Sequence, residues 1–185
     1  MSVRHVSRGA INSLIASIVG ACLYAVSIYF TSVVDIPGTD NVQLRPGVVI
    51  PIVCGAFFGP VAGFVSGFAG NLIADWALGW DFWPFWYVGN GLMGLAVGLL
   101  RPADYNYARP RHVGVVLVWA VIGIAVGMAF ASISELWVTH SSWNDVVWVN
   151  FVPAFLSNTL NAVILTPIVL LLYGLLRDTT KLDPA

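Results

Sequence analysis

Long uncharged stretches separated by short polar segments dominate the chain. A helix needs about 20 apolar residues to cross the hydrocarbon core of a bilayer, and Ile11 to Phe30 contains no charged residue. The pattern predicts an all-α membrane protein, a single integral membrane domain over residues 1–185 that forms a six-transmembrane-helix bundle. The helices are expected at about 9–31, 46–57, 61–78, 84–100, 113–137 and 147–176.

The boundary between the second and third predicted helices lies at Phe58-Gly59-Pro60. Glycine and proline both disfavour a continuing helix, so the long apolar passage around them is divided into two helices. The helix at 46–57 is short for a full crossing. A single kinked or re-entrant element is the alternative interpretation of this passage.

Composition excludes a water-soluble globular protein. Hydrophobic residues make up 58% of the chain and charged residues 9%, against roughly 25% charged residues in ordinary soluble domains. Lipid is therefore the expected surrounding. The net charge of −1 and the absence of a Lys/Arg cluster exclude nucleic acid as a partner. Cys22 and Cys54 lie inside apolar runs and are interpreted as packing residues.

The distribution of cations predicts the orientation in the membrane. Short cytoplasmic loops carry the excess of Lys and Arg, and with six helices both termini and the loop after residue 100 share one side. Both termini are therefore expected to be cytoplasmic, with Arg45 alone on the outer side. The cations on the cytoplasmic side are Arg4, Arg8, Arg101, Arg109, Arg111, Arg177 and Lys181.

Small residues recur at every fourth position in several predicted helices, and such rows allow helices to approach closely in lipid. The rows that contain Gly63, Gly94 and Gly127 are interpreted as internal packing seams. The first helix carries a nearly continuous small-residue face, which suits either a partner helix or internal packing. The candidate partner contacts on this face are Ala16, Gly20, Ala21 and Ala25.

Amide and carboxyl groups inside the predicted spans indicate a site, because such groups are costly in hydrocarbon and face the bundle interior or a cavity. Hydrogen bonding between helices is the structural alternative for each asparagine. Seven of the eight tryptophans lie on or near the outward segments, which favours a pocket of flat apolar faces, although an interfacial aromatic belt explains some of them. The candidate substrate-binding residues are Arg45, Asn71, Asp75, Trp83, Trp86, Asn90, Trp143, Asn158 and Asn161.

Catalytic arrangements are nearly absent from the sequence. It has no phosphate-cradling glycine loop and no paired-histidine metal spacing, so no catalytic residue, metal or cofactor is predicted and the chain is not expected to be an enzyme. Asp75 and Glu135 are the only candidates for buried carboxylates, which gives ion-driven transport little support. The energy for any transport is expected to come from another subunit.

Four segments carry a resemblance to a known family. They are Leu44-Arg45-Pro46-Gly47-Val48-Val49-Ile50-Pro51, Phe58-Gly59-Pro60-Val61-Ala62-Gly63-Phe64, Gly70-Asn71-Leu72-Ile73-Ala74-Asp75 and Gly89-Asn90-Gly91-Leu92-Met93-Gly94. Together they resemble the substrate-binding S component of energy-coupling factor (ECF) transporters, as does the six-helix layout. The resemblance runs from Gln43 to Leu100.

The resemblance implies high-affinity binding of a vitamin or related micronutrient from outside a bacterial or archaeal plasma membrane. It also implies that a separate T component and two cytoplasmic ATPases supply the energy. The family's motif on the first helix is two alanines separated by three residues, which Ala21 and Ala25 match. Ala16 and Gly20 lie closer to the cytoplasmic side. Which of the two pairs would contact a partner helix therefore stays open.

The ligand is constrained in kind by the residues around the expected pocket. Tryptophan-rich outer loops favour a flat conjugated ring, so a flavin, a thiamine-related pyrimidine or a corrinoid would fit. A polyanionic ligand is disfavoured because Arg45 is the only outward cation. A structural or assembly subunit of a membrane complex and a small membrane-embedded enzyme are the alternatives from other classes.

Overall fold

Six α-helices make up most of the described chain. The computed structural model describes residues 8–32, 43–100 and 105–181, and it confirms the predicted all-α class and the count of six helices. A 3-10 turn, Pro46–Val48, leads into the second helix, and a π-helical segment, Asp145–Phe151, leads into the sixth. The helices are α1 (Arg8–Thr31), α2 (Val49–Phe58), α3 (Pro60–Leu78), α4 (Pro84–Leu99), α5 (Pro110–Val138) and α6 (Val152–Lys181).

The helices differ in whether they are long enough to cross a bilayer. Four helical segments in the described ranges are long and apolar enough, namely α1, α3, α5 and the continuous stretch Asp145–Arg177. Helix α4 has 16 residues, which give about 24 Å of rise against the roughly 30 Å of the hydrocarbon core. Helix α2 is shorter, with 10 residues. Both α2 and α4 therefore fall short of a full straight crossing.

Gly59 separates α2 from α3. Its φ of 96° lies in a region that residues with a side chain rarely adopt, and Pro60 follows as the first residue of α3, where its missing N–H costs no helical hydrogen bond. The Gly59 N–H donates to the Gly55 carbonyl at 3.0 Å, and the Gly59 carbonyl accepts from Gly63 N–H at 3.1 Å. The passage thus forms two helices that meet at a tight turn.

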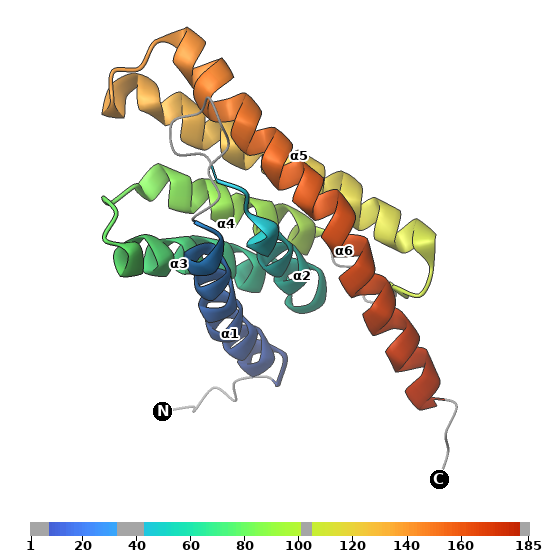
Figure 1. Ribbon diagram of the computed structural model, residues 1–185. Coiled ribbons are helices and arrows are strands. Elements are labelled where there is room, and N and C mark those ends of the chain that lie inside the picture. The colour runs from blue at the N-terminus through green and yellow to red at the C-terminus, as the bar shows by residue number, and fades with distance from the viewer. Residues whose placement is uncertain (1–7, 33–42, 101–104, 182–185) are drawn as a thin grey trace, which may run out of the picture.

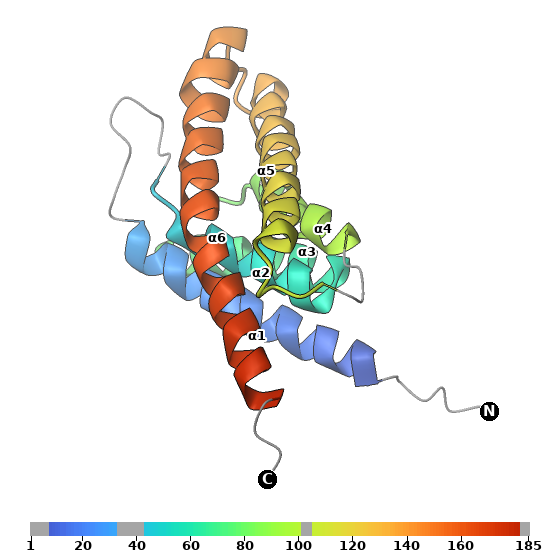
Figure 2. The same cartoon turned by 90° about the vertical axis from the view of Figure 1, so that its right-hand side faces the viewer.

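The helices form two groups in space. Helices α3 and α4 lie side by side, with α2 packed on both and α1 crossing α3 (Figure 1). Helices α5 and α6 form a longer pair, and α5 also packs on α4 (Figure 2). The α3–α4 and α5–α6 connections lie at the same end of the molecule, while the start of α1 and the end of α6 lie toward the lower part of both views.

Glycines bring α2, α3 and α4 into backbone contact. A Cβ at Gly63 or at Gly55 would overlap the carbonyl oxygen of Gly94 on α4. Gly89 and Gly127 make the equivalent approach between α4 and α5, where a Cβ on either would meet the carbonyl oxygen of the other. The predicted internal seams at these rows are therefore present, and α4 is held closely on two sides.

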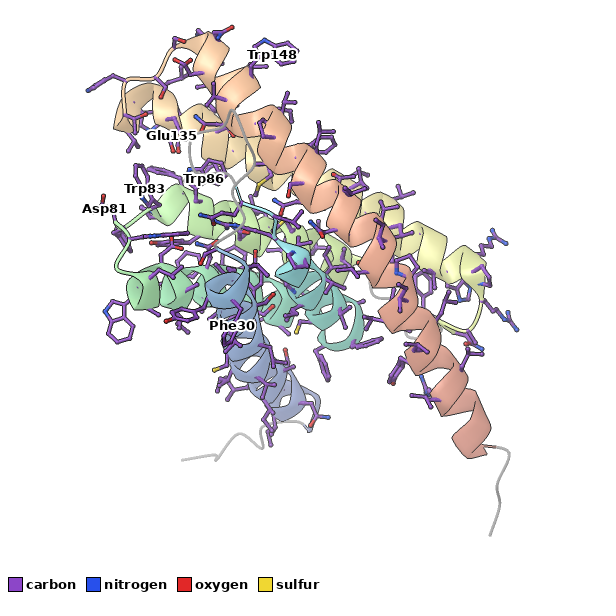
Figure 3. All side chains as sticks on the ribbon, in the orientation of Figure 1. Phe30, Asp81, Trp83, Trp86, Glu135 and Trp148 are labelled. Carbon is purple, nitrogen blue, oxygen red and sulfur yellow. The ribbon has the colours of Figure 1, made fainter. Side chains whose placement is uncertain are left out.

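The small-residue face of α1 packs inside the chain. Ala16, Gly20, Ala21 and Ala25 are all buried, and a Cβ at Gly20 would overlap Cys54 of α2. Of the two interpretations of this face, the structure therefore corresponds to internal packing. In this chain α2 and α3 cover these four residues, and their role as contacts for a partner helix stays a prediction. The exposed side of α1 carries large apolar side chains instead, including Phe30 (Figure 3).

The segment before α5 is fixed to α2 at the end of the molecule away from the α3–α4 connection. The Tyr107 hydroxyl donates to the Ala56 carbonyl oxygen at 2.9 Å. The Tyr107 ring packs edge-on against Phe57, with ring centroids 5.3 Å apart, and Phe57 in turn lies 4.4 Å from Tyr173 of α6. Helix α2, helix α6 and the segment before α5 are thus joined by aromatic side chains at this end.

Candidate ligand-binding cavity

A cavity of about 690 Å³ opens among the end of α3, the start of α4, the end of α5 and the start of α6. This volume lies within the range of about 300–1,000 Å³ that is usual for small-molecule sites. Trp83, Trp86 and Glu135 lie close together between α4 and α5 in Figure 3, with Asp81 at the α3–α4 connection. The lining residues are Ser32, Gln43, Arg45, Asn71, Asp75, Gly79, Trp80, Asp81, Trp83, Trp86, Asn90, Met128, Glu135, Thr139, Ser141, Asn150, Ala154 and Asn158.

One wall of the cavity is a polar chain on α3 and on the segment before α2. The Arg45 guanidinium donates from Nη1 to Asn71 Oδ1 at 2.7 Å, and Asn71 Nδ2 donates to Asp75 Oδ2 at 3.1 Å. Asn71 and Asp75 are four residues apart, so the helix puts them on one face. Both are buried, and Asp75 Oδ1 has no hydrogen-bond partner among the described residues.

A second part of the cavity lining is aromatic and lies at the start of α4. Trp83 precedes Pro84, and its backbone N–H donates to the Tyr87 hydroxyl at 3.0 Å. The Trp86 indole donates from Nε1 to Glu135 Oε1 at 2.7 Å. The Thr139 hydroxyl donates to Glu135 Oε2 at 2.9 Å, which engages the second carboxylate oxygen. The Trp86 indole is thereby held by α5, whereas at Trp83 it is the backbone that the Tyr87 hydroxyl holds.

Asn90 ties the aromatic wall to α1. Its Oδ1 accepts from the Tyr24 hydroxyl at 2.7 Å, and its Nδ2 donates to the Trp86 carbonyl oxygen at 2.8 Å. Tyr24 and Asn90 are both fully buried. Because both ends of the amide are engaged by the protein, Asn90 lines the cavity mainly as a support for α4.

Asn158 presents an unused acceptor from α6. Its Nδ2 lies 3.2 Å from Met128 Sδ, a weak acceptor, and its Oδ1 has no partner among the described residues. Gln43 Oε1 is likewise buried without a partner. Asp75, Asn158 and Gln43 all line the cavity and come from three segments of the chain. The three unpartnered oxygens themselves are buried from solvent, and a buried polar group without a partner is costly.

The structure brings together most of the predicted site residues but leaves two outside. Arg45, Asn71, Asp75, Trp83, Trp86, Asn90 and Asn158 all line the cavity. Trp143 does not line it, being 64% exposed, and Asn161 donates from Nδ2 to the Ser157 carbonyl oxygen on its own helix. Several other tryptophans also lie on the outside of the bundle, and Trp148 points away from it in Figure 3. The tryptophan excess therefore combines cavity residues with surface residues.

Glu135 and Gln43 are the lining residues of most consequence that were not among the predicted binding residues. Glu135 is the one carboxylate in the apolar run that forms α5, and this isolation is the sequence signal for it. Gln43 carries no such signal, because it stands in a polar segment. Among the described residues, no group of three or more His, Cys, Asp or Glu side chains is placed to hold a metal ion.

Comparison with known proteins places the chain in a family. The sequence profile of the family described as the S component of ECF-type riboflavin transporters matches residues 10–175. A UPF0397 protein from Vibrio atlanticus (strain LGP32) is 31% identical over 88 residues, 48% of this chain and 47% of that protein, so the match spans about half the length of the curated relative. No solved structure matches the chain. Since the profile covers most of the sequence, the chain is an integral membrane protein and belongs to the S-component family of ECF-type riboflavin transporters.

Proposed function

We propose that this chain captures riboflavin, or a flavin close to it, for uptake across the membrane. The observation that carries the proposal is the pairing of two indoles, Trp83 and Trp86, with a polar wall in one cavity of about 690 Å³, the Trp86 indole being held by Glu135. A flavin has a flat conjugated ring that suits stacking on indoles. Its ring imide and ribityl hydroxyls suit the amide and carboxylate groups opposite. The match of the chain to the riboflavin S-component family supports the same choice.

The proposed capture takes place on the outer side of the membrane. The cavity lies at the end of α5 and the start of α6, whereas Arg109 and Arg111 stand at the beginning of α5 and Arg177 at the far end of α6. Cations collect on cytoplasmic loops, so this arrangement supports an outward-facing cavity with cytoplasmic termini. Arg4 and Arg101, which contributed to the same prediction, lie outside the described residues.

The energy is proposed to come from other subunits, namely a T component and two cytoplasmic ATPases. In the chain itself the described cavity contains no arrangement for nucleotide hydrolysis. Its Glu135 carboxylate accepts from Trp86 of α4, and its Asp75 carboxylate accepts from Asn71 on the same helix. The S-component family supports partners of this kind in general. Binding and energy supply would then be separate properties, which can be measured separately.

Titration of the purified full chain tests the proposal. Small molecules that co-purify in detergent are first identified by mass spectrometry, and ligand-free protein is then titrated with riboflavin by calorimetry and by quenching of flavin fluorescence. Saturable one-to-one binding at submicromolar riboflavin supports the proposal, and thiamine serves as the comparison ligand. Protein that stays monodisperse and binds neither compound would favour an assembly subunit and overturn flavin capture.

A further inference from the structure

Tyr87 on α4 contacts three consecutive residues of the connection between α3 and α4. Its hydroxyl accepts a hydrogen bond from the Trp83 backbone N–H at 3.0 Å, and the same hydroxyl donates to the Asp81 carbonyl oxygen over a longer 3.4 Å. The Tyr87 ring packs edge-on against the Phe82 ring, with centroids 5.5 Å apart. One side chain therefore holds the segment 81–83 at both ends and in the middle.

The Tyr87 side chain is itself fixed from the α3 side. It is 1% exposed, and its ring packs edge-on against Phe68 of α3, with centroids 6.0 Å apart. Asp81 and Trp83 line the cavity, whereas Tyr87 does not. Tyr87 can therefore influence a bound ligand only through the residues that it holds.

The bond to Trp83 takes the place of a usual cap at the start of α4. Trp83 precedes the first helical residue, Pro84, and within the described chain its side chain makes no capping hydrogen bond. In a capping box the side chain of the third helical residue accepts from the backbone N–H of the cap residue. Here the hydroxyl of Tyr87, the fourth helical residue, accepts from that N–H. Tyr87 therefore sets the backbone position from which the Trp83 indole extends.

We infer that Tyr87 is a positioning residue of the binding site, which holds the backbone of 81–83 and thereby keeps the Trp83 indole in place for the ligand. This inference rests on the proposed function. A flat ring gains from an indole that is already ordered, because a side chain or segment that must be ordered at the moment of binding lowers the affinity. The Tyr87 hydroxyl supplies this order before the ligand arrives.

Tyr87→Phe tests the inference on the full chain in detergent, because it keeps the ring and removes only the hydroxyl. Calorimetric titration should show riboflavin binding about fivefold weaker than in the wild type. The backbone amides of 79–83 should exchange hydrogen for deuterium faster in the ligand-free variant. Tyr107→Phe is the matched control, since it also removes a buried hydroxyl that bonds to a backbone group, but at the other end of the molecule. It should leave the riboflavin affinity unchanged.

A double-mutant comparison separates positioning from general support of the fold. In the Trp83→Ala background, Tyr87→Phe should weaken riboflavin binding by less than about twofold, whereas a purely structural role predicts the same loss in both backgrounds. That equal loss, an unchanged affinity in Tyr87→Phe, or a similar loss in Tyr107→Phe would each overturn the inference while leaving flavin capture intact. A wild-type chain that binds no flavin would overturn the proposed function and the ligand-binding role of Tyr87, while faster exchange in Tyr87→Phe would still support its hold on 81–83.

Discussion

Trp86 and Glu135 are joined by a hydrogen bond of 2.7 Å between the indole Nε1 and the carboxylate Oε1. They stand 49 residues apart, on the first turn of α4 and near the end of α5. The other carboxylate oxygen accepts from Thr139, so one buried side chain holds both an indole and the end of a helix. Burial of a carboxylate is costly, and here these two bonds compensate for it.

This bond predicts a difference between two substitutions of Glu135. Glu135→Leu should weaken riboflavin binding about tenfold, close to 1.4 kcal/mol, because the Trp86 indole loses its acceptor and its fixed orientation. Glu135→Gln keeps an oxygen for the indole and should stay within about threefold of the wild type. Calorimetric titration measures both. Equal affinity in the leucine and glutamine variants would show that orientation of Trp86 does not matter for binding.

The two buried asparagines at the cavity should respond differently to truncation. Asn158 lines the cavity and its oxygen has no partner among the described residues, so Asn158→Ala should weaken riboflavin binding by about 1 kcal/mol with little change in melting temperature. Asn90→Ala instead leaves the buried Tyr24 hydroxyl without its acceptor, so it should lower thermal stability by about 1–3 kcal/mol. Titration and thermal unfolding of the two variants, each measured in the same detergent, distinguish a ligand contact from a support.

Asn71 links Arg45 to Asp75, and its removal should affect both. In Asn71→Ala the Arg45 guanidinium loses the acceptor at 2.7 Å and Asp75 loses a donor at 3.1 Å. Hydrogen bonds to charged groups contribute about 1.5–3 kcal/mol, so riboflavin affinity should fall by about tenfold or more. Asn161→Ala is the control, because this amide is engaged on its own helix away from the cavity. A loss of the same size in Asn161→Ala would contradict the proposal that riboflavin binds in this cavity.

Truncation of a tryptophan should affect flavin binding only where the side chain lines the cavity. Trp83→Ala removes an aromatic face from the cavity and should weaken flavin binding by about tenfold. Trp143→Ala, which also deletes an indole at the α5–α6 end, should leave the affinity unchanged because that side chain is 64% exposed and lies outside the cavity lining. Quenching of flavin fluorescence reports both affinities. An equal loss in the two variants would indicate a general effect of the interfacial indoles.

Much of the fold follows from sequence periodicity. Uncharged runs predict the six helices, and Gly59 with Pro60 predicts the break between α2 and α3, which the positive φ of Gly59 produces. The helix at 46–57 was expected to be short for a full crossing, and in the structure α2 has 10 residues after the 3-10 turn Pro46–Val48. The π-helical start of α6 left no sequence signal that we recognised.

The candidate site was only partly predictable for a different reason. Polar side chains inside apolar runs must face the interior, and this rule identified Asn71, Asp75, Asn90 and Asn158. The rule cannot say which partner each one meets, since the bond between Trp86 and Glu135 depends on how α4 and α5 pack. The sequence also leaves the role of the small residues of α1 open. Such residues allow close packing equally well against a helix of the same chain and against a helix of a partner.

The glycine contacts of α4 limit the positions at which substitutions could alter which ligand this protein binds. At Gly63, Gly94, Gly89 and Gly127 one backbone rests on another, so even a methyl group would separate the helices and no gradual series of substitutions exists. The rim of the cavity is different, because side chains at its edge can be exchanged one at a time without moving a helix. We therefore expect substitutions that change the choice of substrate to succeed at the ends of α3, α4 and α5 and to fail at these glycines.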